Sequence, residues 1–316
     1  MRVLVTGATG FVGWPLCQDL ARRGWQVRAA VRNQARLPEG CEPCIVGDIG
    51  PGTDWTEALE GVDAVAHLAA RVHVMRERAE DPLASFRRTN VEGTLRLAAA
   101  AARAGVGRLV FLSSVKALAD ASPDGPLTDS SSPNPQDPYG ISKYEAEAGL
   151  REIANQFHLE LVILRPPLVY GPGVKGNLRA LLKLVDRRVP LPLGAVRNQR
   201  SLLGLGNLVD AIRLGLSHPA APGGAFLLCD GDDLSTAELV RRLGAALGRR
   251  TALFPVPVSL LKLGAGCVGR AAEARRLLSS LTVDDRPIRQ ELEWKPPFTV
   301  DEGLAEMVAW FRAARL

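Results

Sequence analysis

Short apolar runs alternate with amphipathic helical stretches through the first half of the chain. The runs are uniformly apolar, which is typical of parallel strands that are covered on both faces. The pattern predicts strands at residues 2–7, 26–32, 42–49, 63–70, 108–114 and 159–167. It predicts helices between them at residues 14–24, 56–62, 82–105 and 138–157. This alternation indicates an α/β fold with a doubly wound parallel sheet.

The pattern loosens after about residue 170, where Gly and Pro become frequent. Helices are predicted in this half at residues 237–248, 259–280 and 300–316. We therefore expect a dinucleotide-binding domain over residues 1–170 and a smaller, mostly helical substrate lobe over residues 171–316. Some segments of the second half are expected to return to the first domain. The lobe should lie over the carboxyl ends of the strands, where open α/β sheets place their ligands.

Composition narrows the class of protein. A hydrophobic content of 47% with 23% charged residues is ordinary for a folded globular chain. The net charge of +5 and the aromatic content of 5% argue against nucleic-acid binding. No membrane span is expected, because about 18 uncharged apolar residues never occur in a row. The five cysteines include one CxxC without a second pair, so no metal is expected. With no leader-like segment, we expect a cytoplasmic protein.

The first predicted turn carries the segment TGATGFVG, residues 6–13. Its glycines, Gly7, Gly10 and Gly13, fall at G-x-x-G-x-x-G spacing between a strand and a helix. Such a turn allows a close backbone approach to a pyrophosphate at a helix N-terminus. The motif therefore predicts a Rossmann-type dinucleotide site rather than a purely structural turn.

The end of the second strand bears on the choice of cofactor. An acidic residue that would hold a ribose 2′-hydroxyl is missing there, and Arg32 and Asn33 follow Val31. An arginine at this place favours a 2′-phosphate, so the expected cofactor is NAD(P), with NADP(H) favoured over NAD(H). The alternative is that Arg32 stacks on adenine or faces solvent. Asp48, after the third strand, is a candidate for the adenine edge.

A tyrosine and a lysine lie one helical turn apart in QDPYGISK, residues 136–143. A free phenol, with a pKa of about 10, is a weak base at neutral pH, but a nearby ammonium would stabilise the phenolate. Asp137 and Pro138 suit the N-cap and first helical position, so Tyr139 would lie in a first turn whose dipole also favours phenolate. Tyr139 and Lys143 are therefore a candidate acid/base pair, although YxxxK alone is also compatible with two surface residues.

Together the motifs resemble the extended short-chain dehydrogenases/reductases, in the branch of nucleotide-sugar epimerases and reductases. The resemblance rests on TGATGFVG, HLAA (67–70), NVEGT (90–94), FLSS (111–114), YGISK (139–143) and LRPPLVYGPG (164–173), in the family's order and at its distances. It implies NAD(P)-dependent redox chemistry on a UDP-sugar, a smaller helical substrate lobe and a homodimer.

The resemblance also implies roles for single residues. Tyr139 would be the general acid/base, Lys143 its partner and a ribose ligand, Ser114 a hydrogen-bond donor to the reacting oxygen, and Asn90 a neighbour of the cofactor. Further cofactor contacts would come from Thr9, Phe11, Val12, Ile49, Leu68, Ala69, Ala70 and Pro166. Asn177 and Arg200 match residues that contact the sugar nucleotide, Arg200 at its diphosphate.

Departures from the family pattern narrow the reaction. Lys116 lies where the related dehydratases place an acid, so elimination of water is not expected. The tyrosine that epimerases usually have is replaced by Leu118, and an acid before LVDA by Gly206 and Asn207. Two enzyme readings remain: reduction of a UDP-4-keto-6-deoxy-hexose in O-antigen or lipopolysaccharide sugar synthesis, and 4-epimerisation of a UDP-hexose. Arg32 tips the balance towards the reductase.

Other classes are weaker fits. Steroid-type reductases share YxxxK, and a non-catalytic dinucleotide sensor would keep the glycine motif but generally not the Ser, Tyr and Lys. Residues 258–278 mix apolar positions with Arg270, Arg275 and Arg276. They are interpreted as a helix pair over the substrate cleft, with a membrane-surface contact as the alternative.

Overall fold

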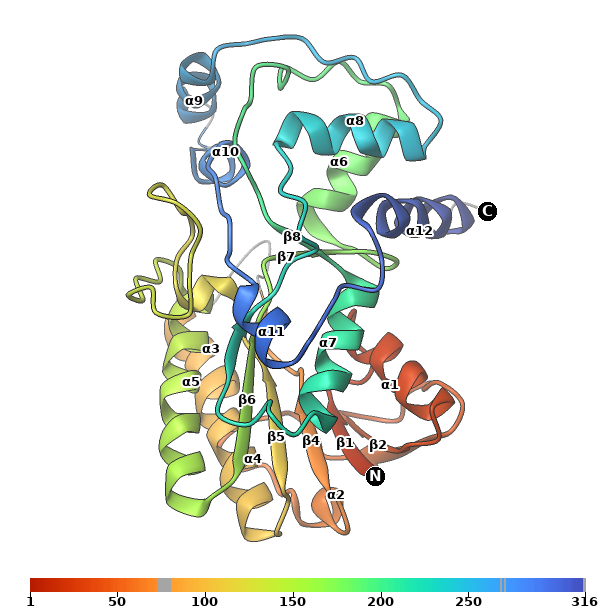
Figure 1. Cartoon of the computed structure of the whole chain (residues 1–316), viewed down its shortest axis with the longest axis vertical. Coiled ribbons are helices and arrows are strands. Elements are labelled where there is room, and N and C mark those ends of the chain that lie inside the picture. Colours follow the sequence, from red (N-terminus) through yellow and green to blue (C-terminus); the bar gives the residue numbers. More distant parts are fainter. Residues whose placement is uncertain (73–80, 268, 270, 315–316) are drawn as a thin grey trace.

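A parallel sheet forms the centre of the computed structural model, which describes residues 1–72, 81–267, 269 and 271–314. Its seven strands run in the order β3-β2-β1-β4-β5-β6-β9, and every neighbouring pair is parallel (Figure 1). They are β1 (Arg2–Thr6), β2 (Gln26–Val31), β3 (Cys41–Ile45), β4 (Ala64–His67), β5 (Arg108–Leu112), β6 (Glu160–Arg165) and β9 (Ala225–Leu227). The order 3-2-1-4-5-6 confirms the predicted Rossmann-type fold class.

Helices cover both faces of this sheet because alternate strand residues point to opposite sides. Val3 and Val5 of β1 pack in one core with α1 (Gly13–Arg22) and α7 (Leu205–Ser217). Leu4, between them, packs in the opposite core with α2 (Thr56–Leu59), α4 (Gly93–Arg103) and α5 (Pro138–Phe157). The apolar runs of the sequence are therefore buried on two sides.

Some predicted elements end earlier than their apolar pattern. The third strand stops at Ile45, and Gly47 follows with a φ of 72° that turns the chain away. The fourth strand stops at His67. The long helix predicted at residues 82–105 is built from α3 (Pro82–Arg87), a π-helical turn (Arg88–Glu92) and α4.

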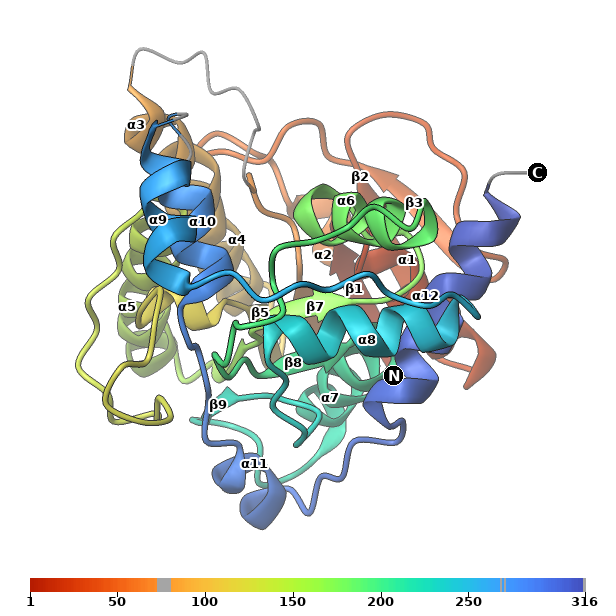
Figure 2. The same cartoon turned by 90° about the horizontal axis from the view of Figure 1, so that it is seen from above.

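Much of the second half forms a lobe above the carboxyl ends of the sheet, while α7, β9 and α11 (Arg286–Glu291) return to the main sheet (Figures 1 and 2). A two-stranded parallel sheet of β7 (Leu168–Tyr170) and β8 (Leu202–Gly204) connects the lobe to the main sheet. The lobe helices are α6 (Gly176–Asp186), α8 (Thr236–Ala246), α9 (Val258–Cys267), α10 (Ala271–Leu278) and α12 (Val300–Ala313). No helix in the described part of the chain is long and apolar enough to cross a membrane. The predicted Arg270 lies outside the described residues.

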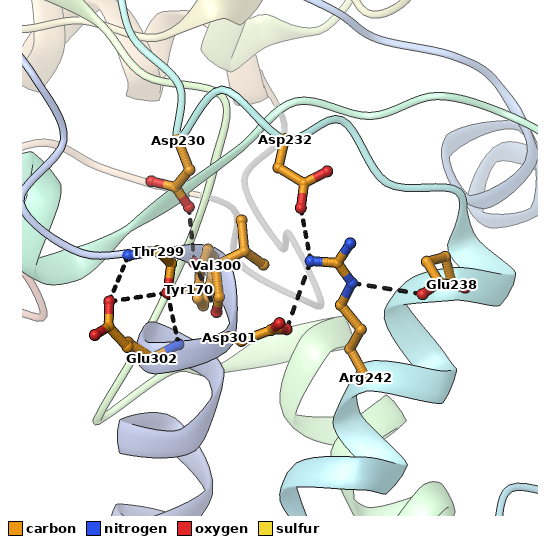
Figure 3. Close-up of polar contacts among 9 residues, drawn as sticks. All are labelled: Tyr170, Asp230, Asp232, Glu238, Arg242, Thr299, Val300, Asp301 and Glu302. Atoms are coloured by element: carbon orange, nitrogen blue, oxygen red, sulfur yellow. Dashed lines mark hydrogen bonds and ion pairs between the residues drawn. The ribbon is translucent and has the colours of Figure 1, made fainter.

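Polar contacts hold the lobe elements together (Figure 3). The buried Tyr170 of β7 donates its hydroxyl to Asp230, which follows β9, at 2.7 Å. Arg242 of α8 pairs with Asp232 at 2.6 Å and with Asp301 of α12 at 3.5 Å. A capping box between Thr299 and Glu302 starts α12. These contacts fix α8 and α12 against the strand pair that leads out of the main sheet.

Candidate active site

The glycine turn follows β1 at the carboxyl edge of the sheet. Gly7 has a φ of 69°, and a Cβ on it would lie 2.9 Å from the amide nitrogen of Ala69 after β4. A Cβ on Gly13 would lie 2.0 Å from the carbonyl oxygen of Gly7, so α1 starts in direct contact with the turn. No side chain caps the first turn of α1, whose N-cap residue is Val12. This cradle fits a dinucleotide pyrophosphate, because glycines without a Cβ let the ligand approach the backbone closely at the positive end of α1.

The buried side chain of Thr6, the last residue of β1, forms hydrogen bonds next to this turn. Thr6 Oγ1 accepts from the backbone N–H groups of Leu68 and Ala69, both at 3.1 Å, and lies 2.7 Å from His67 Nδ1. The Thr6 hydroxyl proton must therefore go to Nδ1, which leaves His67 Nε2 as the donor to Thr94 Oγ1 at 2.9 Å. Burial and the nearby Lys143 lower the pKa of His67 to about 3. The sequence analysis missed this neutral histidine, although it lies inside the HLAA motif.

At the end of the cradle where adenine is expected, Arg32 is accompanied by a carboxylate. Arg32 Nη1 lies 3.7 Å from Asp48 Oδ1, and both side chains are largely exposed. The Asp48 carboxylate therefore partly balances the positive charge of Arg32, which was expected to meet a 2′-phosphate. The other predicted cofactor contacts lie along the same edge of the sheet: Thr9, Gly10 and Phe11 in the turn, Ile49 after β3, Ala70 after β4 and Pro166 after β6.

The helix of the YxxxK pair begins as predicted. Asp137 is the N-cap residue of α5, accepting from Gly140 N at 2.8 Å, and Pro138 occupies the first turn. Lys143 is 2% exposed and donates its ammonium to the carbonyl oxygen of Leu112, the last residue of β5, at 2.7 Å. Its Nζ lies 4.4 Å from the Phe111 ring centroid and 6.0 Å from that of Tyr139. The pair therefore faces the carboxyl end of the sheet rather than solvent.

The electrostatics of the pair differ from the expected phenolate. Burial and the Asp137 carboxylate raise the pKa of Tyr139 to about 12, and a hydrogen bond with the Ser114 side chain acts in the opposite direction. Burial lowers the pKa of Lys143 to about 7, against the attraction of Glu147. The helix dipole and Lys143 thus do not produce a phenolate by themselves, because desolvation disfavours both charged forms.

Two further predicted residues meet at the start of α5. Ser114 caps a short 3-10 turn, Val115–Ala117, and is hydrogen-bonded to Tyr139. Asn90 lies in the π-helical turn and is 1% exposed, so it is not a helix-surface amide. Its Nδ2 donates to Ser142 Oγ at 2.9 Å and its Oδ1 accepts from Arg71 N at 2.7 Å. Single π-turns inside helices are frequent at functional sites, which agrees with this placement.

A buried ion pair beneath the site was not predicted. Glu147, one turn after Lys143, is fully buried and accepts from Ser113 Oγ at 2.6 Å. Arg165, the last residue of β6, donates to both carboxylate oxygens of Glu147. Ser113, of uncertain role in the sequence, is thereby assigned to the support of β5, β6 and α5. The four-residue spacing of Lys143 and Glu147 was a visible signal for their shared face.

The predicted substrate contacts lie in the lobe. Arg200 Nη1 donates to the carbonyl oxygens of Arg276, at 2.5 Å, and Ser279, at 3.2 Å, and burial lowers the pKa of its guanidinium. Arg276 of α10 in turn reaches Asp137, with Nη2 3.9 Å from Oδ2. The α10 end of the segment 258–278 therefore lies near the start of α5. Asn177 lies exposed in the first turn of α6.

The residues that depart from the family pattern, Asn207 and Leu118, make contacts in the structure that suit their residue types. The side chain of Asn207 donates to Asp230 Oδ1 at 2.7 Å and to the carbonyl oxygen of Phe298 at 2.8 Å. An acid at position 207 would face the Asp230 carboxylate, so an amide is the residue that this chain requires. Leu118 is 1% exposed and fills a core with Val115 and Leu281 instead of presenting a phenol.

Comparisons with known proteins identify the family of the chain. The chain is 40% identical over 315 residues, 99% of its own length and 96% of the other, to a UDP-glucose 4-epimerase of Vibrio cholerae. It is 32% identical over 84% of its length, and 78% of the other, to an Escherichia coli O157:H7 N-acetyl-alpha-D-glucosaminyl-diphospho-ditrans,octacis-undecaprenol 4-epimerase. Among solved structures, MoeE5 in complex with UDP-glucuronic acid and NAD superposes with a TM-score of 0.81 at 27% identity, over 99% of this chain and all of the other.

The Thermotoga maritima UDP-glucose 4-epimerase, solved with UDP-glucose, shares the fold with a TM-score of 0.80 at 22% identity over both whole chains. The sequence profile of the NAD-dependent epimerase/dehydratase family matches residues 3–229, from β1 past β9. The matched segment contains the glycine turn, the YxxxK helix and the serine that follows β5. The chain is thus an enzyme of the NAD-dependent epimerase/dehydratase family.

Proposed function

We propose that this enzyme oxidises and reduces C4 of the hexose in a UDP-sugar. The observation that carries the proposal is the cluster at the carboxyl end of β5, where the buried Lys143 places Nζ 6.0 Å from the Tyr139 ring centroid and Ser114 is hydrogen-bonded to Tyr139. A carbinol that loses or gains a hydride must exchange a proton at its oxygen. A phenol and a hydroxyl joined by one hydrogen bond can both reach that oxygen. Bound NAD would accept and return the hydride.

Each residue then has a distinct task. Tyr139 takes the proton from the sugar oxygen when the carbinol is oxidised and returns it when the ketone is reduced. Ser114 donates a hydrogen bond to the same oxygen. Lys143 faces the Tyr139 ring and would bond the nicotinamide ribose, and its positive form favours ionisation of the phenol. Because the pKa of Tyr139 is about 12 in the protein alone, the positive charge of bound NAD⁺ is needed to lower this pKa towards neutral pH.

The first candidate reaction is 4-epimerisation of a UDP-hexose. The epimerase names of the relatives at 40% and 32% identity support it. In this reaction the same NAD accepts the hydride and returns it to the other face of C4, so no coenzyme is consumed.

The second candidate is reduction of a UDP-4-keto-6-deoxy-hexose, with one NAD(P)H consumed per turnover. It is favoured by the absence of an acid at the end of β2, where Arg32 follows Val31. The contact between Arg32 and Asp48 weakens this argument, because a neighbouring carboxylate repels a 2′-phosphate. We therefore propose NAD(H) as the cofactor in place of the NADP(H) that Arg32 alone favoured.

One set of incubations separates the two candidates. Purified protein is mixed with UDP-glucose or UDP-GlcNAc without added coenzyme, and the sugar nucleotides are separated by chromatography. Appearance of the C4 epimer, with tightly bound NAD in the denatured protein, supports the epimerase. Oxidation of added NADH or NADPH by the 4-keto-6-deoxy sugar, with no epimer formed, supports the reductase. If neither reaction occurs with any UDP-sugar, the proposed function is contradicted.

A further inference from the structure

The lysine in the segment after Ser114 is held between two carboxylates. Lys116 Nζ forms one ion pair with Asp137 and a second with Asp120 Oδ1 at 3.1 Å. The Lys116 side chain is 22% exposed, so these pairs are partly shielded from water. On the backbone, Lys116 N donates to Ser114 Oγ at 3.2 Å. A single residue thus contacts both the candidate serine and the N-cap residue of α5.

The packing of the backbone makes this contact close. A Cβ on Gly140, in the first turn of α5, would lie 2.5 Å from the carbonyl oxygen of Lys116. Asp137 uses Oδ1 to cap α5 through Gly140 N and uses Oδ2 for the ion pair with Lys116. Lys116 is therefore joined to the start of α5 by its backbone and by its side chain, and Tyr139 lies between these two contacts in the sequence.

The charges around Tyr139 come from three elements. Lys143 belongs to α5 itself, Lys116 and Asp120 belong to the segment after β5, and Arg276 of α10 lies 3.9 Å from Asp137. Asp137 is the carboxylate that acts directly on the phenol and opposes its ionisation. Two positive groups of the described residues contact this carboxylate: Lys116 forms an ion pair with it, and Arg276 lies at a longer distance.

We propose that Lys116 is a positioning residue that holds Ser114 and Tyr139 in register and cancels the negative charge of Asp137 beside the phenol. The proposal rests on the proposed function, in which Tyr139 handles the substrate proton. It also gives a physical reason for a lysine at this position: an acid here would face Asp137 and Asp120, and three carboxylates would oppose formation of a phenolate.

The test measures the ionisation of Tyr139 without any sugar substrate. The protein has three tyrosines, so biosynthetic 3-fluorotyrosine gives three ¹⁹F resonances, and Tyr139→Phe assigns one of them. We expect Lys116→Met to raise the pKa of the Tyr139 resonance by about 0.5 to 1, since it leaves Asp137 less compensated. Lys116→Arg should stay near the wild type. Asp137→Asn, which still caps α5, should lower the pKa of Tyr139. In the double variant Lys116→Met/Asp137→Asn, the increase of this pKa caused by Lys116→Met should disappear.

Arg87→Met is the matched control, because Arg87 pairs with Glu145 on the same helix. It should leave the Tyr139 titration unchanged. An unchanged titration in Lys116→Met, or an increase that Asp137→Asn does not cancel, overturns the proposal. If Lys116→Met does not fold, Asp137→Asn alone decides by its direction. A wild type that turns over no UDP-sugar contradicts the proposed function and leaves this titration result standing, so the two failures are distinguishable.

Discussion

Arg165 donates two hydrogen bonds to the fully buried carboxylate of Glu147, from Nε to Oε1 at 3.0 Å and from Nη2 to Oε2 at 2.6 Å. The pair joins the end of β6 to the middle of α5, one turn from Lys143. Because Ser113 also donates to Glu147, the strand that leads to Ser114 is held by the same carboxylate. The geometry of the candidate site is therefore set by a buried charge pair that touches none of the predicted substrate contacts.

Removing the charge of Glu147 should destabilise the protein strongly. We expect Glu147→Gln to lower the free energy of unfolding by about 3 to 5 kcal/mol, because it leaves the Arg165 guanidinium buried without its counter-ion. Glu147→Gln/Arg165→Met should cost less than the sum of the single changes. Urea unfolding followed by circular dichroism measures both. Glu145→Gln, an exposed partner of Arg87 on the same helix, should cost less than about 1 kcal/mol. Equal losses at positions 145 and 147 would contradict this account.

Loss of the Tyr139 hydroxyl should abolish most turnover without removing the cofactor. We expect Tyr139→Phe to lower kcat by about 10² to 10⁴ on whichever UDP-sugar the wild type converts, because general acid/base catalysis contributes that much. NAD binding, followed by quenching of intrinsic fluorescence, should change little. The control is Tyr144→Phe, a 39% exposed tyrosine on the same helix that should keep wild-type activity. A Tyr139→Phe enzyme of near wild-type rate would remove Tyr139 from the mechanism.

The buried His67 should make stability fall on the acid side. Its pKa is about 3 in the folded protein and about 6.5 when unfolded, so between these values the unfolded chain binds one more proton. Stability linked to His67 is therefore complete above pH 6.5 and decreases as the pH falls towards 3. From pH 7.5 to 5.5 the loss is about 1.4 kcal/mol. Unfolding titrations at both pH values should show it in the wild type but not in His67→Gln. His158→Gln, at the protein surface, should retain the loss.

Restoring the family acid at position 207 should be harmful here. Asn207→Asp places a second carboxylate against Asp230, whose own pKa is already raised by burial. We expect a loss of about 2 to 4 kcal/mol at pH 8 and a smaller one at pH 5. The sign follows because a raised folded-state pKa gives stability at low pH that is lost as the pH rises through it. Thermal unfolding at both pH values measures this, with exposed Asn155→Asp as control. A loss independent of pH would indicate that the two carboxylates do not interact.

Much of the core region could be predicted from local pattern. The apolar runs of β1, β5 and β6 are continuous, and the glycine turn, Asp137 and Pro138 mark helix starts through backbone chemistry that acts over a few residues. Local signals are strong where burial on both faces or a cap selects the residue type. The same logic correctly placed Tyr139 and Lys143 on one helical face.

Other features depended on contacts between distant segments. β9 has three residues and completes the sheet only by pairing with β6, and β7 and β8 are three residues each. Such short strands have no periodicity of their own, because their hydrogen-bond partners define them. The π-turn that contains Asn90 could not be predicted either, because the apolar pattern of the surrounding helix continues through it.

The sequence by itself determined the doubly wound class, the glycine turn and the candidate acid/base pair on one helical face, because each is encoded by neighbouring residues. Only the tertiary structure decided the electrostatics of the site. Burial and Asp137 oppose the ionisation of Tyr139, Asp137 is itself paired with Lys116, and Arg32 is paired with Asp48, which follows a different strand. A charge interaction falls with distance in space and with exposure to water. Neither quantity is written in the spacing of residues along the chain.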